Sequence, residues 1–151
     1  MSPTKKDSTT GNFSAEERAA MKEYAAELQK QKRRQGSADK AALDLADQLE
    51  KIASLAGEDR VLAEKVHEIV TAVAPQLAPK TWYGMPAYYR DGKPIVFFQP
   101  AGKFKARYAT LGFNDGALLD DGAMWPTSYA LTTLGPKEEA AIAEVVRRAA
   151  G

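Results

Sequence analysis

The hydrophobic pattern of this chain changes near Lys80, and that change constrains the fold more than any other feature. Before it, apolar residues recur at intervals of three and four positions, as on a helix that is buried along one side. After it, the apolar segments 81–89 and 93–99 flank the pair Asp91-Gly92. Such a pair favours a two-residue hairpin turn, because a type I′ turn requires a positive φ at both positions. The sequence therefore predicts helices followed by an antiparallel sheet.

The residues around this turn also predict how the strands pair. We expect Arg90 and Lys93 to close the turn. Pro94 then lies opposite Tyr89, where its missing N–H points away from the hairpin. Residues 95–98 are apolar without alternation, so this strand is expected to be central and covered on both faces. The remaining strands of a three- or four-stranded sheet are expected in two segments, 103–113 and 127–134.

Four helical segments are expected, with boundaries set by capping residues and by Gly and Pro. Ser14 and Glu17 form a capping box before the first helix, and Ser37 can cap the second. The third helix carries the most regular apolar stripe in the chain, which includes Leu62 and Val66. The expected helices occupy residues 15–35, about 37–56, 58–74 and about 136–150.

Together these patterns predict an α+β fold in which helices cover one face of a small antiparallel sheet. The helices that begin near residues 58 and 136 would provide that cover. The first two helices would form an extension that packs on this unit or on a second copy of the chain, and a homodimer is expected through them. The expected divisions of the chain are a disordered leader (1–12), a two-helix extension (13–56) and an α+β domain (57–151).

The composition excludes several classes of function. The 151 residues contain no cysteine, which removes disulfide frameworks, thiolate metal sites and cysteine nucleophiles. Because 21 basic residues face 20 acidic ones, no overall attraction to DNA or anionic membranes is expected, and nucleic acid is not an expected partner. No apolar run is long enough for a membrane span, and no apolar segment follows the charged start, so we expect a cytoplasmic protein.

Catalytic residues are difficult to assemble from this sequence. The one histidine, His67, lies on the third helix between Glu64 and Glu68, where a solvated surface position is expected. A nucleophile, a base and an orienting group do not occur in a recognisable pattern. The protein is therefore predicted not to be an enzyme.

The first candidate site combines the aromatic residues of the segment 82–89 with a basic stripe on the segment 103–108, where basic and apolar residues alternate, so that the basic ones are expected on one face of a strand. If residues 81–89 are one strand, Trp82 shares a face with Pro86, and about half of the aromatic side chains lie on the face that helices leave uncovered. Exposed aromatics beside cations suit an anionic small molecule, a nucleic-acid backbone or a partner protein. The alternatives are packing of the aromatics beneath the first two helices, and protection of an edge strand by lysines. The candidate ligand-binding residues are Trp82, Tyr83, Met85, Tyr88, Lys103, Lys105 and Arg107.

Four carboxylates on the third helix form the second candidate site. Carboxylate oxygens suit hard cations such as ferric iron, calcium and magnesium. The alternative is that the first two acidic residues only complement the dipole at the helix N-terminus. The candidate metal ligands are Glu58, Asp59, Glu64 and Glu68.

The segment APKTWYGMPAYYRDGKPIVFFQPAGKFKARYATLGF (residues 78–113) resembles the YdhG-like family of bacterial domains of unknown function. In that family a Y-G-M-P-A-Y core, here residues 83–88, follows a helix and precedes a glycine-turn hairpin. The resemblance extends from about residue 58 to the C-terminus. It implies an α+β unit similar to frataxin and the role of an intracellular iron chaperone. The implied partner is iron or an iron-accepting protein, with the four carboxylates above as ligands, and no other cofactor is implied.

Overall fold

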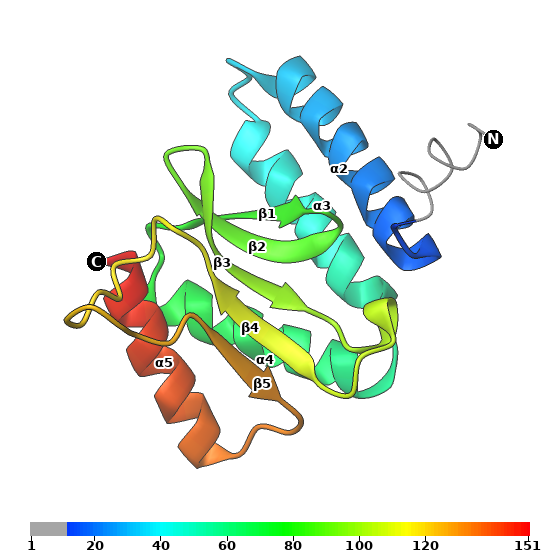
Figure 1. The fold of residues 1–151 in the computed structure, drawn as a ribbon. Coiled ribbons are helices and arrows are strands. Elements are labelled where there is room, and N and C mark those ends of the chain that lie inside the picture. Colours follow the sequence, from blue (N-terminus) through cyan, green and yellow to red (C-terminus); the bar gives the residue numbers. More distant parts are fainter. Residues whose placement is uncertain (1–11) are drawn as a thin grey trace.

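The computed structural model describes residues 12–151 and shows an α+β fold (Figure 1). Its one sheet has five antiparallel strands in the order β1-β2-β3-β4-β5, so each strand pairs with its neighbours in the sequence. The helices are α2 (Ala15–Arg34), α3 (Lys40–Ser54), α4 (Gly57–Val73) and α5 (Pro136–Ala150). The strands are β1 (Ala78–Trp82), β2 (Met85–Arg90), β3 (Lys93–Gln99), β4 (Ala109–Phe113) and β5 (Ser128–Leu131), with a short 3₁₀ helix η1 (Gly102–Phe104) before β4. The expected leader at 1–12 lies outside the described residues except for its last position.

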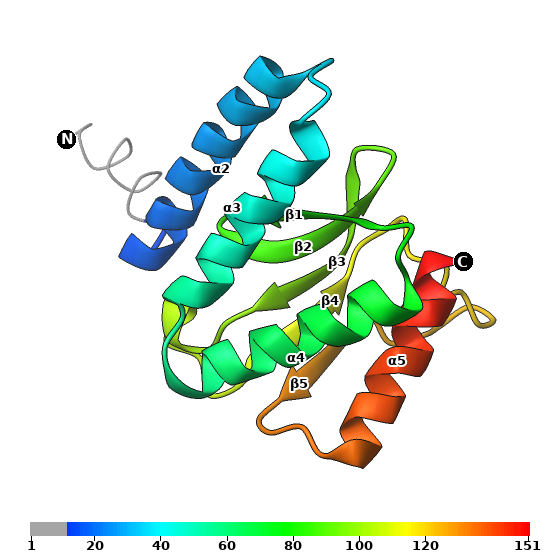
Figure 2. The same ribbon diagram turned by 180° about the vertical axis from the view of Figure 1, so that it is seen from behind.

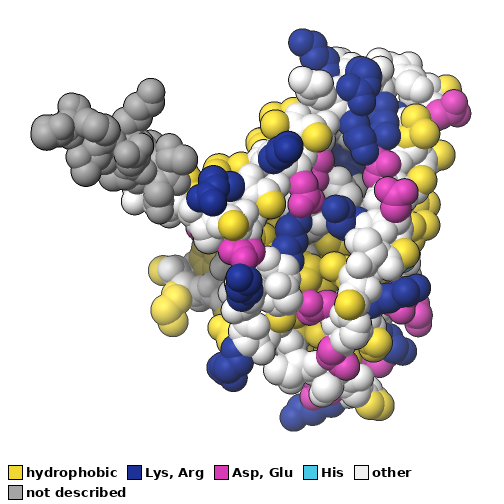
Figure 3. Space-filling view, turned by 90° about the vertical axis from the view of Figure 1, so that its right-hand side faces the viewer, with side chains coloured by type: hydrophobic (Ala, Val, Ile, Leu, Met, Phe, Trp, Pro, Cys, Tyr) yellow, Lys and Arg dark blue, Asp and Glu magenta, His cyan; other side chains and the backbone are white. Residues whose placement is uncertain are grey.

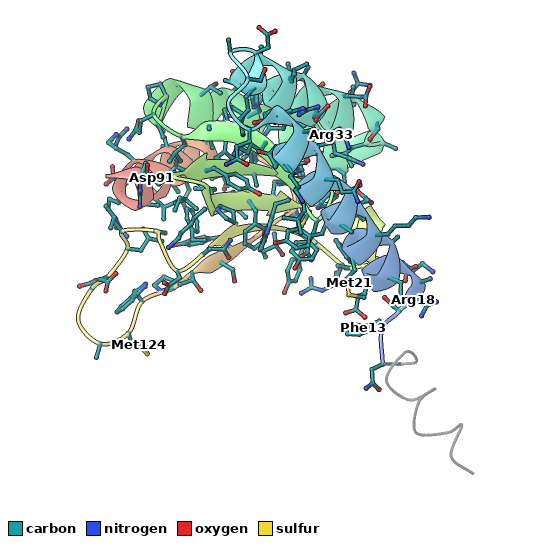
Figure 4. All side chains as sticks on the ribbon, turned by 90° about the horizontal axis from the view of Figure 1, so that it is seen from above. Phe13, Arg18, Met21, Arg33, Asp91 and Met124 are labelled. Carbon is teal, nitrogen blue, oxygen red and sulfur yellow. The ribbon has the colours of Figure 1, made fainter. Side chains whose placement is uncertain are left out.

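The helices divide between the two sides of the sheet. α3, α4 and α5 lie against one face, which we call the helix face (Figure 2). α2 crosses the β1 edge and reaches the opposite side, which we call the open face (Figure 4). The loop 114–127 projects on that same side. The open face is thus bordered by α2 at one end and by this loop at the other.

The core lies between the helix face and its three helices. α3 adds Ile52 to this core and also buries Gln48, whose amide nitrogen donates to the main-chain oxygens of Lys80 (2.9 Å) and Ala87 (2.8 Å). α3 therefore shares one core with α4 and α5. None of the helices within residues 12–151 is long and apolar enough to cross a membrane. The fully buried core side chains include Tyr88, Val96, Phe98 and Leu111 from the sheet and Val66, Val70 and Val146 from the helices.

The sheet has five strands, and the prediction of three or four is wrong because residues 81–89 are two strands rather than one. Tyr83 and Gly84 have φ angles of 53° and 76° and connect β1 to β2 as a two-residue turn. Trp82 consequently pairs with Met85. The predicted grouping of Trp82 with Pro86 is also wrong, because the turn places Trp82 on the open face, and Pro86 shares the helix face with Tyr88.

The second hairpin turn was predicted correctly. Asp91 and Gly92 have φ angles of 51° and 78°, and Arg90 pairs with Lys93 on either side of them. Pro94 lies opposite Tyr89 and outside the pairing of β3 with β4, which starts at Val96. Its missing N–H therefore interrupts no ladder.

The predicted strand over 103–113 is confirmed only in its second half. η1 and Lys105, which has a φ angle of 54°, replace its first half. The cause is a contact that the local sequence does not show. The carboxylate of Asp59 accepts hydrogen bonds from the main-chain N–H groups of Ala101 (2.9 Å) and Gly102 (2.8 Å) and fixes a tight turn there. The basic stripe of Lys103, Lys105 and Arg107 on one strand face was therefore predicted wrongly.

The helix boundaries agree closely with the expected ones. The capping box of Ser14 and Glu17 is confirmed, with both hydrogen bonds present at 3.0 and 2.8 Å. The second helix starts later than expected, because Asp39 rather than Ser37 occupies the N-cap position. Ser37 instead accepts a hydrogen bond from the N–H of Asp39 in the preceding turn (3.2 Å).

Candidate functional site

The predicted ligand-binding residues do not form one surface. Tyr88 is fully buried on the helix face, and Met85 is 5% exposed on the other side of the sheet. Neither side chain presents a contact surface to solvent. Trp82 and Tyr83 are half-buried, so they are the aromatic candidates that a ligand could touch.

The three predicted basic residues are separate and engaged elsewhere. Lys103 donates to the carboxylate of Glu23 (3.1 Å) and to the main-chain oxygen of Tyr83 (3.1 Å). Lys105 pairs with Glu16 at 3.0 Å. These two lysines attach α2 to the rest of the molecule. Arg107 is exposed, with its guanidinium 5.1 Å from the centre of the Tyr108 ring.

Tyr83 is the main attachment point of α2 on the sheet. Its ring stacks on that of Tyr24, with centroids 4.2 Å apart and planes within 8° of parallel. Its main-chain N–H and that of Gly84 donate to the carboxylate of Glu27, at 2.8 and 2.7 Å. A turn with positive φ angles points two N–H groups to one side, and a carboxylate from α2 satisfies both.

A cleft of about 430 Å³ lies between α2 and the β1–β2 hairpin, and we call it the α2 cleft. Its walls combine aromatic rings with lysines and amide side chains. Seen from the right-hand side of Figure 1, basic and acidic side chains on the surface are mixed rather than separated into patches of one sign (Figure 3). The residues that give the α2 cleft its chemical character are Tyr24, Gln31, Lys32, Lys40, Lys80, Trp82 and Tyr89.

Lys80 is the central cation of the α2 cleft. Its ammonium nitrogen lies 4.7 Å from the centre of the Tyr89 ring and 3.4 Å from the amide oxygen of Gln31. Among the described residues no carboxylate forms an ion pair with it, unlike Lys40, which pairs with Asp44 at 2.8 Å. Burial and the adjacent Lys40 ammonium lower the pKa of Lys80 to about 8. Lys80 is therefore a half-buried cation whose charge is only partly compensated.

A buried carboxylate behind the α2 cleft holds its polar walls in place. Asp44 is 3% exposed and accepts hydrogen bonds from Gln31, Arg34 and Lys40, each at 2.8 Å. Burial alone would raise the pKa of Asp44, but these hydrogen bonds outweigh it and keep the pKa below its usual value. The ionised Asp44 thus joins α2 to the start of α3 and positions Lys40 beside Lys80.

The aromatic walls of the α2 cleft come from the two hairpin strands. Tyr89 donates its hydroxyl hydrogen bond to the main-chain oxygen of Thr81 (3.2 Å), and burial raises the pKa of Tyr89, so its phenol stays neutral. The Trp82 ring lies 5.2 Å from that of Phe97 on the open face. These contacts hold the rings of Trp82 and Tyr89 in place as walls of the α2 cleft. The sequence singled out Trp82, but it gave no local signal for Lys40, Lys80 or Gln31 as parts of one site.

The four predicted metal ligands remain spread along α4. The Asp59 carboxylate accepts hydrogen bonds from the N–H groups of Ala101 and Gly102 at the start of η1, and Glu64 pairs with Arg60 at 3.1 Å. Glu58 and Glu68 are exposed on the same helix. Within residues 12–151 no three His, Asp or Glu side chains come close enough together to hold a metal ion. Iron binding by these carboxylates stays a prediction.

His67 is not the solvated residue that the sequence led us to expect. It is half-buried, and its Nδ1 atom lies 3.1 Å from the hydroxyl oxygen of the buried Tyr88. Burial lowers the pKa of His67 below 6.5. His67 thus provides a hydrogen-bond partner for the buried Tyr88 hydroxyl. This contact lies on the side of the sheet away from the α2 cleft.

Comparison of the chain with protein-family models, with curated proteins and with solved structures finds no match. The resemblance to the YdhG-like family therefore stays a prediction. The function has to be argued from the α2 cleft itself.

Proposed function

We propose that this chain is a binding protein that holds a small organic anion in the α2 cleft. The anionic group would lie between Lys80 and Lys40, and the apolar part of the ligand would lie against Trp82 and Tyr89. The observation that carries the proposal is the half-buried Lys80 ammonium, which faces a cleft without a carboxylate partner among the described residues. An anion supplied by a ligand would complete this pair.

The size of the α2 cleft supports a small-molecule ligand. Its 430 Å³ lies within the range of about 300–1,000 Å³ that is typical of small-molecule sites. A mixture of aromatic walls and a few fixed polar groups is also typical of such sites. A protein partner would instead require a much larger and flatter contact surface.

The charge of the lining supports an anion. Lys32, Lys40 and Lys80 line the α2 cleft, and Glu27 is the one acidic side chain among the lining residues. The Glu27 carboxylate is already engaged by two main-chain N–H groups. Its effect on a ligand is therefore weaker than that of a free carboxylate, and the balance at the cleft favours a negative group.

The aromatic rings favour a ligand with a planar or apolar portion. Trp82 and Tyr89 lie on the open face of neighbouring strands, and Tyr24 approaches from α2. Ring faces contribute apolar contact area and bind planar groups by stacking. Phenyl phosphate and benzoate are accordingly suitable probes, because each joins a ring to an anionic group.

The proposal is tested by calorimetric titration of the protein with phenyl phosphate and with benzoate. Binding is expected to weaken with added salt. Lys80→Met should weaken it by about tenfold or more, because each factor of ten is worth about 1.4 kcal/mol and a charge-assisted contact is worth at least that. Lys22→Met is the matched control, since Lys22 is exposed on α2 and does not line the α2 cleft. No binding of either probe, or equal binding by the two variants, would overturn the proposal.

A further inference from the structure

We infer that Lys80 forms a reversible imine with the carbonyl group of its ligand, so that the α2 cleft captures 2-oxo acids. This inference rests on the proposed function and specifies its ligand class. A 2-oxo acid is a small organic anion, and it carries an electrophilic carbon next to its carboxylate. Its two groups match the two neighbouring amines of the α2 cleft, Lys40 and Lys80.

The geometry leaves the Lys80 amine available to react. Its contacts are the face of the Tyr89 ring and a 3.4 Å contact to the amide oxygen of Gln31, both of which it can leave at little cost. The Lys40 amine differs, because the buried Asp44 carboxylate holds it in an ion pair at 2.8 Å. One lysine is thus fixed as a cation and the adjacent one is free to act as a nucleophile.

The environment also raises the share of neutral amine on Lys80. The charged groups around it are Lys40 and Asp44 on α3 and Glu27 and Lys32 on α2, with Arg34 bound to Asp44 and the neutral phenol of Tyr89 beside the amine. With a pKa of about 8, about a tenth of Lys80 is neutral at pH 7, against less than about a thousandth of an ordinary lysine. Desolvation beside a second cation is an established way of activating a lysine for imine chemistry.

The step is balanced without an oxidant or a reductant. The lone pair of the neutral Nζ attacks the ketone carbon, and the carbonyl electron pair moves to oxygen, which takes up a proton to give a carbinolamine. The nitrogen releases a proton, and the hydroxyl takes up a proton and leaves as water with the electron pair of the C–O bond, while the nitrogen lone pair forms the C=N bond of the iminium ion. Addition of water reverses the reaction and releases the unchanged 2-oxo acid. The Lys40 ammonium pairs with the carboxylate throughout and keeps the ketone carbon beside Lys80.

Phenylpyruvate is the suitable probe, because it joins a 2-oxo acid to a ring that can lie against Trp82. The purified protein is incubated with phenylpyruvate and sodium cyanoborohydride, which reduces an imine to a stable secondary amine. Intact mass and peptide mapping then locate the adduct. We expect one adduct, at Lys80, formed about tenfold or more faster at pH 7 than at any exposed lysine. The rate should rise with pH and level off above about pH 8.

Two variants and one ligand analogue make the test specific. Lys80→Arg keeps the positive charge but cannot form an imine, so it should lose the adduct, whereas the control Lys22→Met should keep it. Phenyllactate has a hydroxyl in place of the ketone, so it should compete for the α2 cleft without forming an adduct. Labelling of Lys80 at the rate of exposed lysines would overturn the inference. Competitive binding of phenyllactate with no Lys80 adduct would overturn it and leave the proposed function standing, and failure of both compounds to bind would overturn both.

Discussion

The ring of Tyr24 lies flat on the ring of Tyr83, with their centroids 4.2 Å apart. This contact fixes α2 against the turn between β1 and β2, and the adjacent Glu27 carboxylate holds the two N–H groups of the same turn. α2 buries little apolar surface of its own, since Ala20 is its one buried residue. The α2 cleft therefore exists only while a small set of stacking and polar contacts keeps α2 docked.

A pair of glycine substitutions tests this dependence. Gly84 and Gly92 occupy equivalent turn positions, with φ angles of 76° and 78°. Replacing either one by Ala costs roughly 1 kcal/mol, because a Cβ is strained at positive φ. At Gly84 the new methyl group also meets the Glu23 carboxylate and the Lys103 ammonium, whereas at Gly92 nothing lies nearby.

Gly84→Ala should therefore lower the free energy of unfolding by about 1–2 kcal/mol more than Gly92→Ala does. It should also increase amide hydrogen exchange throughout α2, which Gly92→Ala should leave unchanged. Denaturant titration and exchange measurements on both variants check this. Equal stability losses with unchanged exchange in α2 would show that the turn does not hold the helix.

The sequence predicted the elements whose signals are local. The Asp91-Gly92 turn was found because both residues tolerate positive φ, and the α4 stripe because its period is regular. The Tyr83-Gly84 turn was missed because Tyr is uncommon at positive φ. What stabilises that turn is Glu27, whose position in the chain is remote from it.

The α2 cleft could not be predicted for the same reason. Lys40 and Lys80 lie on different elements, and the buried Asp44 that fixes the first has no signature in a helix rich in Ala and Leu. The basic residues that the sequence singled out, Lys103 and Lys105, pair instead with acidic residues of α2. Tertiary contacts therefore decided which cations are paired and which face a cleft.

The buried Asp44 should be the most sensitive polar residue of this region. Asp44→Asn leaves the cations of Arg34 and Lys40 without their buried carboxylate partner, so we expect a loss of roughly 3 kcal/mol in the free energy of unfolding. Asp39→Asn is the control, because Asp39 is exposed and its side chain makes no capping hydrogen bond. Its effect should stay within about 0.5 kcal/mol. Urea denaturation of both variants checks this, and similar losses would contradict the assigned role of Asp44.

The charge on Lys80 should lower the free energy of unfolding, and the size of this effect should depend on pH. Its pKa is about 8 in the folded protein, below the unfolded value of 10.5, so the unfolded chain binds more protons between these values. Wild-type stability should therefore rise with pH through this window. Lys80→Met should be more stable than the wild type at pH 7, by on the order of 1 kcal/mol once solvent screening of the half-exposed amine is allowed for.

Above about pH 11 that advantage should disappear, because the amine is then largely neutral in both the folded and the unfolded wild type. Thermal denaturation of the wild type and of Lys80→Met at the two pH values measures it. An advantage that is unchanged across this range would mean that the Lys80 ammonium is not penalised by its surroundings.

The burial of His67 predicts that the free energy of unfolding also depends on pH below neutrality. Burial lowers its pKa below 6.5 in the folded protein, so the unfolded chain takes up the proton first as the pH falls. Stability should therefore decrease as the pH drops from about 6.5 toward the folded pKa. His67→Asn should flatten this decrease, and an NMR titration of the imidazole should show the lowered pKa directly. A His67 that titrates at or above 6.5 would contradict its placement against Tyr88.

The most direct test of the central claim is an amide NMR titration of the protein with phenyl phosphate. If the α2 cleft is the ligand site, the shifts should concentrate on its walls, at Gln31, Lys80 and Tyr89, and the Lys80→Met variant should need about tenfold or more ligand to reach the same shifts. Shifts confined to the segment 102–107 or to α4, or an unchanged spectrum at millimolar ligand, would contradict the account.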